Sequence, residues 1–91
     1  MTDAIPLAPK LDHGAAAPLH ALLLGHCGRP VHLDGTSVRG IGGLCAQVLL
    51  AAARRWEMDR QTWQIEASEA MQGDLRRLGL AREILKPETA I

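Results

Sequence analysis

Hydrophobic and polar positions along the chain change their spacing in a way that predicts a strand followed by a helix. Val31 and Leu33 alternate with His32 and Asp34, as in a half-buried strand. A polar, glycine-rich turn follows, and over residues 42–58 apolar side chains recur at helical spacing. The apolar face predicted for this second helix consists of Ile41, Leu44, Cys45, Val48, Leu49, Ala52 and Trp56.

The N-terminal third predicts an extended segment and a first helix. Residues 4–11 alternate imperfectly around Pro6 and Pro9, which suits an edge strand or an irregular extended segment. Asp12 is a candidate helix N-cap, so we expect residues 14–27 to form the first helix. Its expected inward positions are Ala16, Leu19, Leu22 and Leu23.

The C-terminal third predicts a further strand and a third helix. Residues 62–66 alternate again, with Trp63 and Ile65 on one side. Ser68 suits the N-cap of the third helix, and Gly79 suits the position just after its end. The expected inner face of that helix consists of Met71, Leu75 and Leu78.

A chain of 91 residues predicts a single domain, and the pattern after Leu80 is that of a C-terminal tail. In the tail, a short helical turn over 82–85 precedes Pro87. The apolar fraction of 47% suffices for one core, which must be largely aliphatic because the chain has two Trp and no Phe or Tyr. Strands that alternate with helices at this spacing predict an α/β sandwich with helices on a small sheet.

Short motifs occur in a fixed order along residues 6–80. Leu-Asp at 11–12 and at 33–34 follows each of the first two predicted strands, and Leu-Gly-Leu at 78–80 ends the third helix. Together with the glycine-rich turn, this order resembles the STAS domain, the fold of the anti-sigma-factor antagonists. The resemblance implies an α/β, STAS-like fold: a small mixed β-sheet with helices packed mainly on one face. It also implies a single STAS-like domain over residues 1–91, with its core over about 6–80 and a tail over 81–91.

In switchable STAS domains, a turn of the type Asp-Ser-Ser-Gly precedes the second helix, and the partner kinase phosphorylates its first serine. Counted without a gap, this chain has Gly42 at the Asp position and Gly43 at the acceptor position, whereas a gapped alignment puts Ile41 at the acceptor. None of these residues has a hydroxyl, so we expect the usual phosphoswitch to be absent. Thr36 and Ser37 in the preceding turn are weaker candidates for phosphorylation, because turn residues of this kind commonly bond their own backbone.

Helical geometry predicts a solvent-facing row on the second helix, next to the small entrance that the glycine turn forms. Leu50 is the apolar member of this row, and the resemblance implies that partners of STAS domains bind there. We therefore expect Leu50→Glu to abolish partner binding and to leave the fold intact. The predicted partner-binding residues are Arg39, Gly40, Gly42, Gly43, Gln47, Leu50 and Arg54.

Composition and spacing disfavour several other functions. Ten basic and ten acidic residues give a formal net charge of zero without a basic stripe, which disfavours nucleic-acid binding. His13, His20, His26 and His32 lack the spacing of metal ligands on one helix face, so we expect neither a metal nor a cofactor. Cys45 falls on the apolar helix face, where packing rather than nucleophilic catalysis is the expected role.

The resemblance implies a non-enzymatic adaptor that binds a protein partner. The leading partner is a sensor or chemotaxis histidine kinase or another anti-sigma-type kinase; the alternative is the ATPase of a phospholipid-transport complex, with this chain as its STAS subunit. A different class of function, a small-ligand or metal-binding sensor that uses the histidines, stays open. Formation of a homodimer also stays open. The start of the chain lacks the features of a signal peptide, and no apolar run is long enough to cross a bilayer, so we expect a cytoplasmic protein without membrane insertion.

Overall fold

The computed structural model describes residues 4–85 of the chain. Strands and helices alternate along it, as the sequence predicts. In chain order the elements are β1 (Ile5–Pro6), β2 (Lys10–Leu11), the 3-10 turn η1 (His13–Ala15), α1 (Ala16–Leu24), β3 (Val31–Gly35), β4 (Gly40–Ile41), α2 (Gly43–Met58), β5 (Trp63–Ala67), α3 (Glu69–Arg77) and α4 (Ala81–Leu85). The helical turn predicted in the tail is thus confirmed, and Pro87 lies outside the described residues.

In the part of the chain that the structure describes, the main sheet has β3 in the middle, with β1 and β5 on either side. Both pairings are parallel: Ile5 lies opposite Leu33, and Val31 lies opposite Trp63. Parallel neighbours follow from the connections, because each crossover contains a helix. A second, two-stranded parallel pair joins β2 to β4. The mixed sheet implied by the resemblance is therefore wrong for the described strands, although the α/β class is confirmed.

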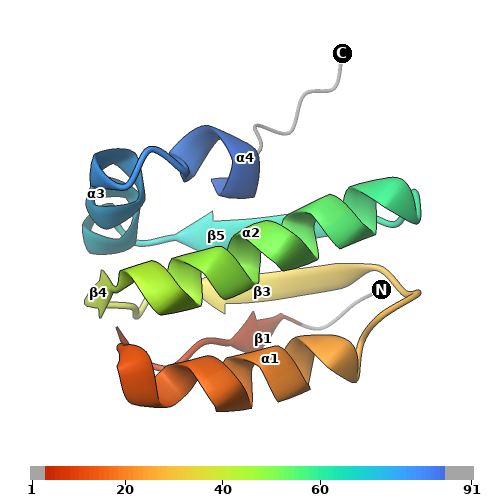
Figure 1. Cartoon of the computed structure of the whole chain (residues 1–91), viewed down its shortest axis with the longest axis horizontal. Coiled ribbons are helices and arrows are strands. Elements are labelled where there is room, and N and C mark those ends of the chain that lie inside the picture. The colour runs from red at the N-terminus through yellow and green to blue at the C-terminus, as the bar shows by residue number, and fades with distance from the viewer. Residues whose placement is uncertain (1–3, 86–91) are drawn as a thin grey trace.

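One face of the sheet carries the helices α1 and α2, which lie side by side and run in the same direction (Figure 1). Val31, Leu33 and Gly35 are buried beneath them, whereas His32 and Asp34 alternate onto the opposite face and are half-buried. This alternation confirms the predicted strand, which continues to Gly35. The strand predicted over 62–66 is confirmed as β5.

Gly35 ends β3 at a point where no side chain fits. A Cβ atom there would lie 2.7 Å from the backbone oxygen of Glu66 and 2.9 Å from Sδ of Met71. Both distances are below van der Waals contact, so a larger residue would push β5 and α3 away from β3. Glycine at this position lets β3, β5 and α3 approach one another closely.

The two tryptophans close the core at the end remote from the glycine turn. The Nε1–H group of Trp56 donates a hydrogen bond of 2.7 Å to the backbone oxygen of Arg29, and that of Trp63 donates one of 2.8 Å to Ile84. The ring centroids lie 5.7 Å apart, with the planes tilted by 58°. Each indole thus satisfies its polar N–H group, with Trp56 buried and Trp63 half-buried.

The buried face of α2 agrees with the predicted one at Cys45, Leu49, Ala52 and Trp56 and differs from it at Leu44, Val48 and Leu50. Leu50 is only 8% exposed, whereas Leu44 is 47% exposed and Val48 is half-buried. The helix α4 packs against α2, and its Glu83 pairs with Arg54, which lies one helical turn beyond Leu50 on the same face of α2. The expectation that Leu50 faces solvent is therefore wrong. The residues that α2 buries are Cys45, Ala46, Leu49, Leu50, Ala52, Ala53 and Trp56.

The first helix is shorter than predicted and begins differently. Asp12 occupies the predicted N-cap position, but of the 3-10 turn η1 that leads into α1, and its side chain makes no capping hydrogen bond. Pro18 occupies the first turn of α1, where its missing N–H group costs no helical hydrogen bond. Leu22 is half-buried rather than inward. The predicted inward residues that are buried are Ala16, Leu19 and Leu23.

The third helix begins and ends as its sequence predicts. The Oγ atom of Ser68 accepts a hydrogen bond of 3.1 Å from the backbone N–H of Met71, which confirms the N-cap. Gly79 adopts a left-handed φ of 75°, and the N–H of Leu80 donates to the carbonyl of Leu75 at 2.9 Å. This pattern is a Schellman motif. Leu78 is the C-cap residue and is 44% exposed, so its predicted inner position is wrong.

Candidate functional site

Backbone hydrogen bonds to the segment that contains β2 hold the glycine-rich turn over residues 36–42 in place. The N–H of Arg39 donates a hydrogen bond of 2.7 Å to Pro9, and the N–H of Gly42 donates one of 2.9 Å to Leu11. Between these bonds, β2 and β4 pair in parallel. The turn is therefore tied to a segment that lies about thirty residues earlier in the chain.

The same turn is fixed from its other side by α3. The carboxylate of Asp74 accepts a hydrogen bond of 3.0 Å from the N–H of Ile41, and the hydroxyl of Ser68 donates one of 2.5 Å to the carbonyl of Val38. The bond from Ile41, followed by the nearby guanidinium of Arg77, holds the pKa of Asp74 below its usual range. The backbone that leads into α2 is therefore held by hydrogen bonds with the β2 segment on one side and with Ser68 and Asp74 on the other.

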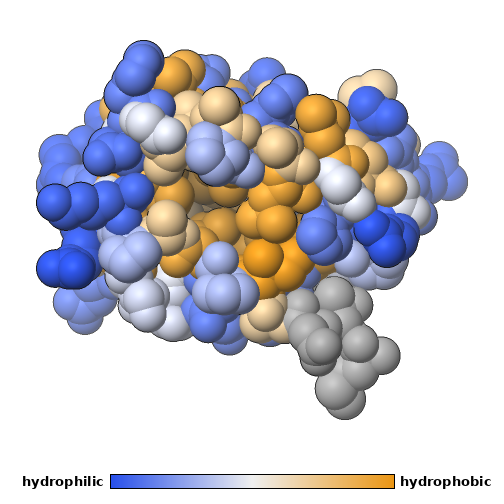
Figure 2. All heavy atoms as spheres, turned by 90° about the horizontal axis from the view of Figure 1, so that it is seen from below, coloured by the Kyte–Doolittle hydropathy of each residue, from blue (hydrophilic) through white to orange (hydrophobic). Residues whose placement is uncertain are grey.

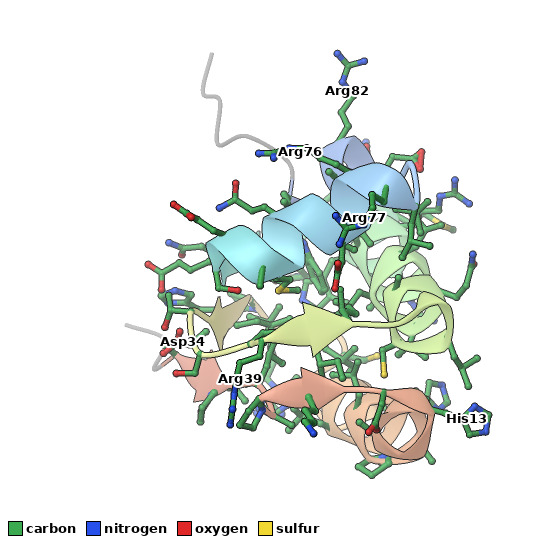
Figure 3. All side chains as sticks on the ribbon, turned by 90° about the vertical axis from the view of Figure 1, so that its left-hand side faces the viewer. His13, Asp34, Arg39, Arg76, Arg77 and Arg82 are labelled. Carbon is green, nitrogen blue, oxygen red and sulfur yellow. The ribbon has the colours of Figure 1, made fainter. Side chains whose placement is uncertain are left out.

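A hollow of about 510 Å³ opens where this turn enters α2. Figure 3 faces this end of the molecule and shows Arg39 and His13 reaching out on opposite sides of it. Within residues 4–85, the side chains of Lys10, His13 and Arg39 make no ion pair, and Asp12 is the acidic residue in the lining. The complete lining consists of Lys10, Leu11, Asp12, His13, Arg39, Gly40, Gly42, Gly43 and Leu44.

The first turn of α2 is open to solvent. A Cβ atom at Gly43 would meet nothing within 4 Å, and Leu44 beside it is exposed. Gly42 is the N-cap residue and supplies no side-chain cap, and the first turn of α2 contains no acidic residue. We name the hollow together with this first turn the α2 entrance. It combines small residues, one exposed leucine and a cationic rim.

The structure brings together part of the predicted partner-binding set. Arg39, Gly40, Gly42 and Gly43 all line the hollow. Gln47 is exposed and lines a groove farther along α2.

The two remaining predicted residues do not belong to this surface. Leu50 lies in the core, and Arg54 points toward α4, where its guanidinium lies 3.4 Å from the carboxylate of Glu83. Sequence reasoning missed Lys10 and His13, and it placed Leu44 inside the core. The Leu-Asp motif next to Lys10 marks the end of a strand, but it carries no signal for the β2–β4 pairing that brings Lys10 to the turn.

Neither Gly42 nor Gly43 offers a hydroxyl at the α2 entrance. Upstream, Asp34 accepts two hydrogen bonds from Thr36, one of 3.0 Å from its N–H and one of 2.6 Å from its hydroxyl. These bonds lower the pKa of Asp34. Thr36 is thus engaged in a local turn, as expected of turn residues, and Ser37 is exposed beside it.

The cysteines and histidines are dispersed. Cys45 is buried, its Sγ atom donates to the backbone oxygen of Asp12 at 3.2 Å, and burial raises the pKa of its thiol. His26 bonds the carbonyl of Leu22 at 3.0 Å, and His32 lies 3.4 Å from Glu66 on the open face of the sheet. Over residues 4–85, no three His, Cys, Asp or Glu side chains gather as metal ligands would.

Two further hollows are apolar. One, of about 230 Å³, lies between the extended N-terminal segment and α1 and is lined by Leu7, Pro18 and Leu22 among others. Apolar side chains gather on that face of the molecule, which lies below in Figure 1 (Figure 2). The other, of about 370 Å³, is the groove between α1 and α2. Among the described helices, none has the length and apolar character needed to traverse a bilayer.

Comparisons of this chain with models of protein families, with curated proteins and with solved structures found no match. The functional interpretation therefore rests on the residues and geometry of the α2 entrance and on the order of motifs in the sequence.

Proposed function

We propose that this protein is a STAS-like adaptor without enzymatic activity, which binds a cytoplasmic signalling protein through the α2 entrance. Its partner is a sensor or chemotaxis histidine kinase. The observation that supports the proposal best is the exposed Leu44 next to the open Gly43, at the place where the sequence resemblance implies a partner surface.

The composition of the α2 entrance suits recognition of a protein. An apolar centre within a polar rim is the usual anatomy of a binding surface, and Leu44 supplies that centre while Lys10 and Arg39 supply the rim. The hydrogen bonds from β2 and α3 hold the surface in one conformation. A surface that is ordered before binding loses little conformational entropy when the partner docks.

The absence of a hydroxyl at Gly43 determines how such an adaptor is regulated. A phosphate at the start of a helix adds charge to a partner surface and repels or attracts the partner. Gly43 cannot accept one, so binding through the α2 entrance follows the concentrations of the two proteins rather than phosphorylation at this position.

Co-purification from the source cells with two matched variants tests the proposal. Leu44→Glu places a charge at the centre of the α2 entrance, whereas Leu78→Glu places the same charge on an equally exposed leucine at the end of α3. We expect wild type and Leu78→Glu to recover a histidine kinase and Leu44→Glu to lose it by at least about tenfold, as expected for a central interface residue.

Each other outcome has a definite meaning. Recovery of a transport ATPase in the same variant-dependent manner replaces the kinase by the phospholipid-transport alternative. Equal recovery by Leu44→Glu shows that the partner surface lies elsewhere. Recovery of the bait alone refutes the adaptor function.

A further inference from the structure

We infer that the groove between α1 and α2 forms the second half of the same binding surface, and that its occupant is an amphipathic helix of the partner with an acidic residue at one end. This inference rests on the proposed adaptor function and deepens it, because it names the kind of segment that the adaptor recognises.

The groove is an apolar trough on the outer side of the helical layer. Its lining includes Leu24, which is 58% exposed, the half-buried Val48, the exposed Ala51 and the buried Trp56. No other element of the described chain lines this groove. An exposed apolar depression of about 370 Å³ in so small a domain is typical of a docking site.

The groove and the α2 entrance are continuous along one row of α2. Leu44, Val48, Ala51 and Arg55 succeed one another at steps of four, three and four residues, so they share one face of the helix. At a rise of about 1.5 Å per residue, this row spans roughly 16 Å. About eleven residues of a partner helix therefore reach from the hollow to the far end of the groove.

The shape of the groove favours a helix as the occupant. α1 and α2 run in the same direction and lie side by side (Figure 1). The surface of two adjacent helices presents ridges and a furrow into which the side chains of a third helix pack. Apolar anchors at spacings of three and four residues are the usual means by which an amphipathic helix binds such a groove.

The charges around the surface determine which end of the occupant is acidic. Among the described residues, Lys10 and Arg39 make no ion pair at the end where α2 begins, and Asp12 is the one carboxylate in the lining there. At the other end, Arg55 is neutralised by an ion pair of 2.9 Å with Asp59. An acidic residue of the occupant is therefore complementary to the end at the hollow.

Site-specific photo-crosslinking in the source cells tests this inference. The photoreactive residue benzoylphenylalanine is placed in the full chain at Ala51 in the groove, at Gly43 in the α2 entrance, or at Gln64 on the opposite face of the sheet as a control. Ala51, Gly43 and Gln64 are all exposed, so each variant is expected to fold. Sequencing of the crosslinked peptide by mass spectrometry identifies the segment that was bound.

We expect the Ala51 and Gly43 probes to crosslink one protein and the Gln64 probe to crosslink none. The peptide captured at Ala51 is expected to carry apolar residues at spacings of three and four, with Asp or Glu at one end. Charge reversal of both Lys10 and Arg39 to Glu should lower the yield at Ala51 by at least about fivefold, because two favourable contacts become repulsive.

Three outcomes overturn the inference, and they are distinguishable from failure of the adaptor function. If Gly43 crosslinks a partner and Ala51 does not, the adaptor function stands and the groove has no part in it. If Ala51 captures lipid, a second copy of this chain or a segment without helical apolar spacing, the occupant is wrong. If neither probe captures a protein, both the groove and the adaptor function fail.

Discussion

Leu44 and Leu50 differ by six positions on α2, yet the structure gives them opposite surroundings. Leu50 is 8% exposed and packs in the core, whereas Leu44 is 47% exposed. Truncation of a buried leucine costs about 2–5 kcal/mol of unfolding free energy, and truncation of an exposed one changes it by about 0.5 kcal/mol or less. A 91-residue domain has a total stability of roughly 5–14 kcal/mol. We therefore predict that Leu50→Ala removes a large share of the stability and that Leu44→Ala does not.

Urea unfolding followed by circular dichroism measures the difference. With a slope of about 1.5 kcal/mol per molar urea, a loss of about 3 kcal/mol lowers the unfolding midpoint by about 2 M. Leu44→Ala should lower it by less than about 0.4 M. Leu50→Glu should fail to fold, because it buries an ionised carboxylate without a partner. Equal midpoints for the two alanine variants, or a folded Leu50→Glu protein, would show that the buried face of α2 is assigned wrongly.

Two further perturbations follow from particular contacts. Gly35→Ala should lower the free energy of unfolding by about 1–3 kcal/mol, because its Cβ would lie 2.7 Å from the Glu66 oxygen, whereas nothing lies within 4 Å of a Cβ at Gly43. Thermal unfolding of the two variants tests the prediction: Gly35→Ala should melt at a clearly lower temperature than Gly43→Ala. Similar melting temperatures for the two variants would contradict it. Asp74, with its pKa held below the usual 3.8 by the N–H of Ile41, stabilises the fold fully above about pH 4 and loses this contribution as the pH falls through its lowered pKa. Asp74→Asn should therefore flatten the acid side of the stability profile, measured as urea midpoints between about pH 2 and pH 6, and an unchanged slope would exclude the effect.

The sequence suffices to predict most elements and fails for the rotation of α2. The strands β3 and β5 alternate cleanly, and α3 has both a capping serine and a terminating glycine, so each carries a local signal. In α2, however, every position over 44–53 except Gln47 is apolar or alanine. Periodicity alone cannot select a face in such a segment. Tertiary packing makes the choice: α4 packs against α2 and pairs its Glu83 with Arg54, one turn beyond Leu50, and no local pattern encodes this contact.

Only those residues of the candidate site that are adjacent in the sequence can be predicted from local patterns. The glycine turn and Arg39 are contiguous in the sequence and mark the start of a helix, so they were found. Lys10 and His13 reach the same hollow only because β2 pairs with β4, in a register that places Lys10 opposite Gly40. Strands of two residues carry too few side chains to set a recognisable alternation. The cationic rim is therefore a product of the fold.

The tryptophan pair gives the protein an optical property of its own. The chain has two Trp and no Tyr, so its near-ultraviolet emission comes from a single pair of indoles whose centroids lie 5.7 Å apart. Trp56 lines the α1–α2 groove, and Trp63 is bonded to the backbone of α4 at Ile84. Entry of a segment into the groove therefore changes the surroundings of Trp56, and detachment of α4 changes those of Trp63, so both events alter the emission of the pair. Fluorescence of the unlabelled protein reports both events, and the Trp63→Phe variant separates them.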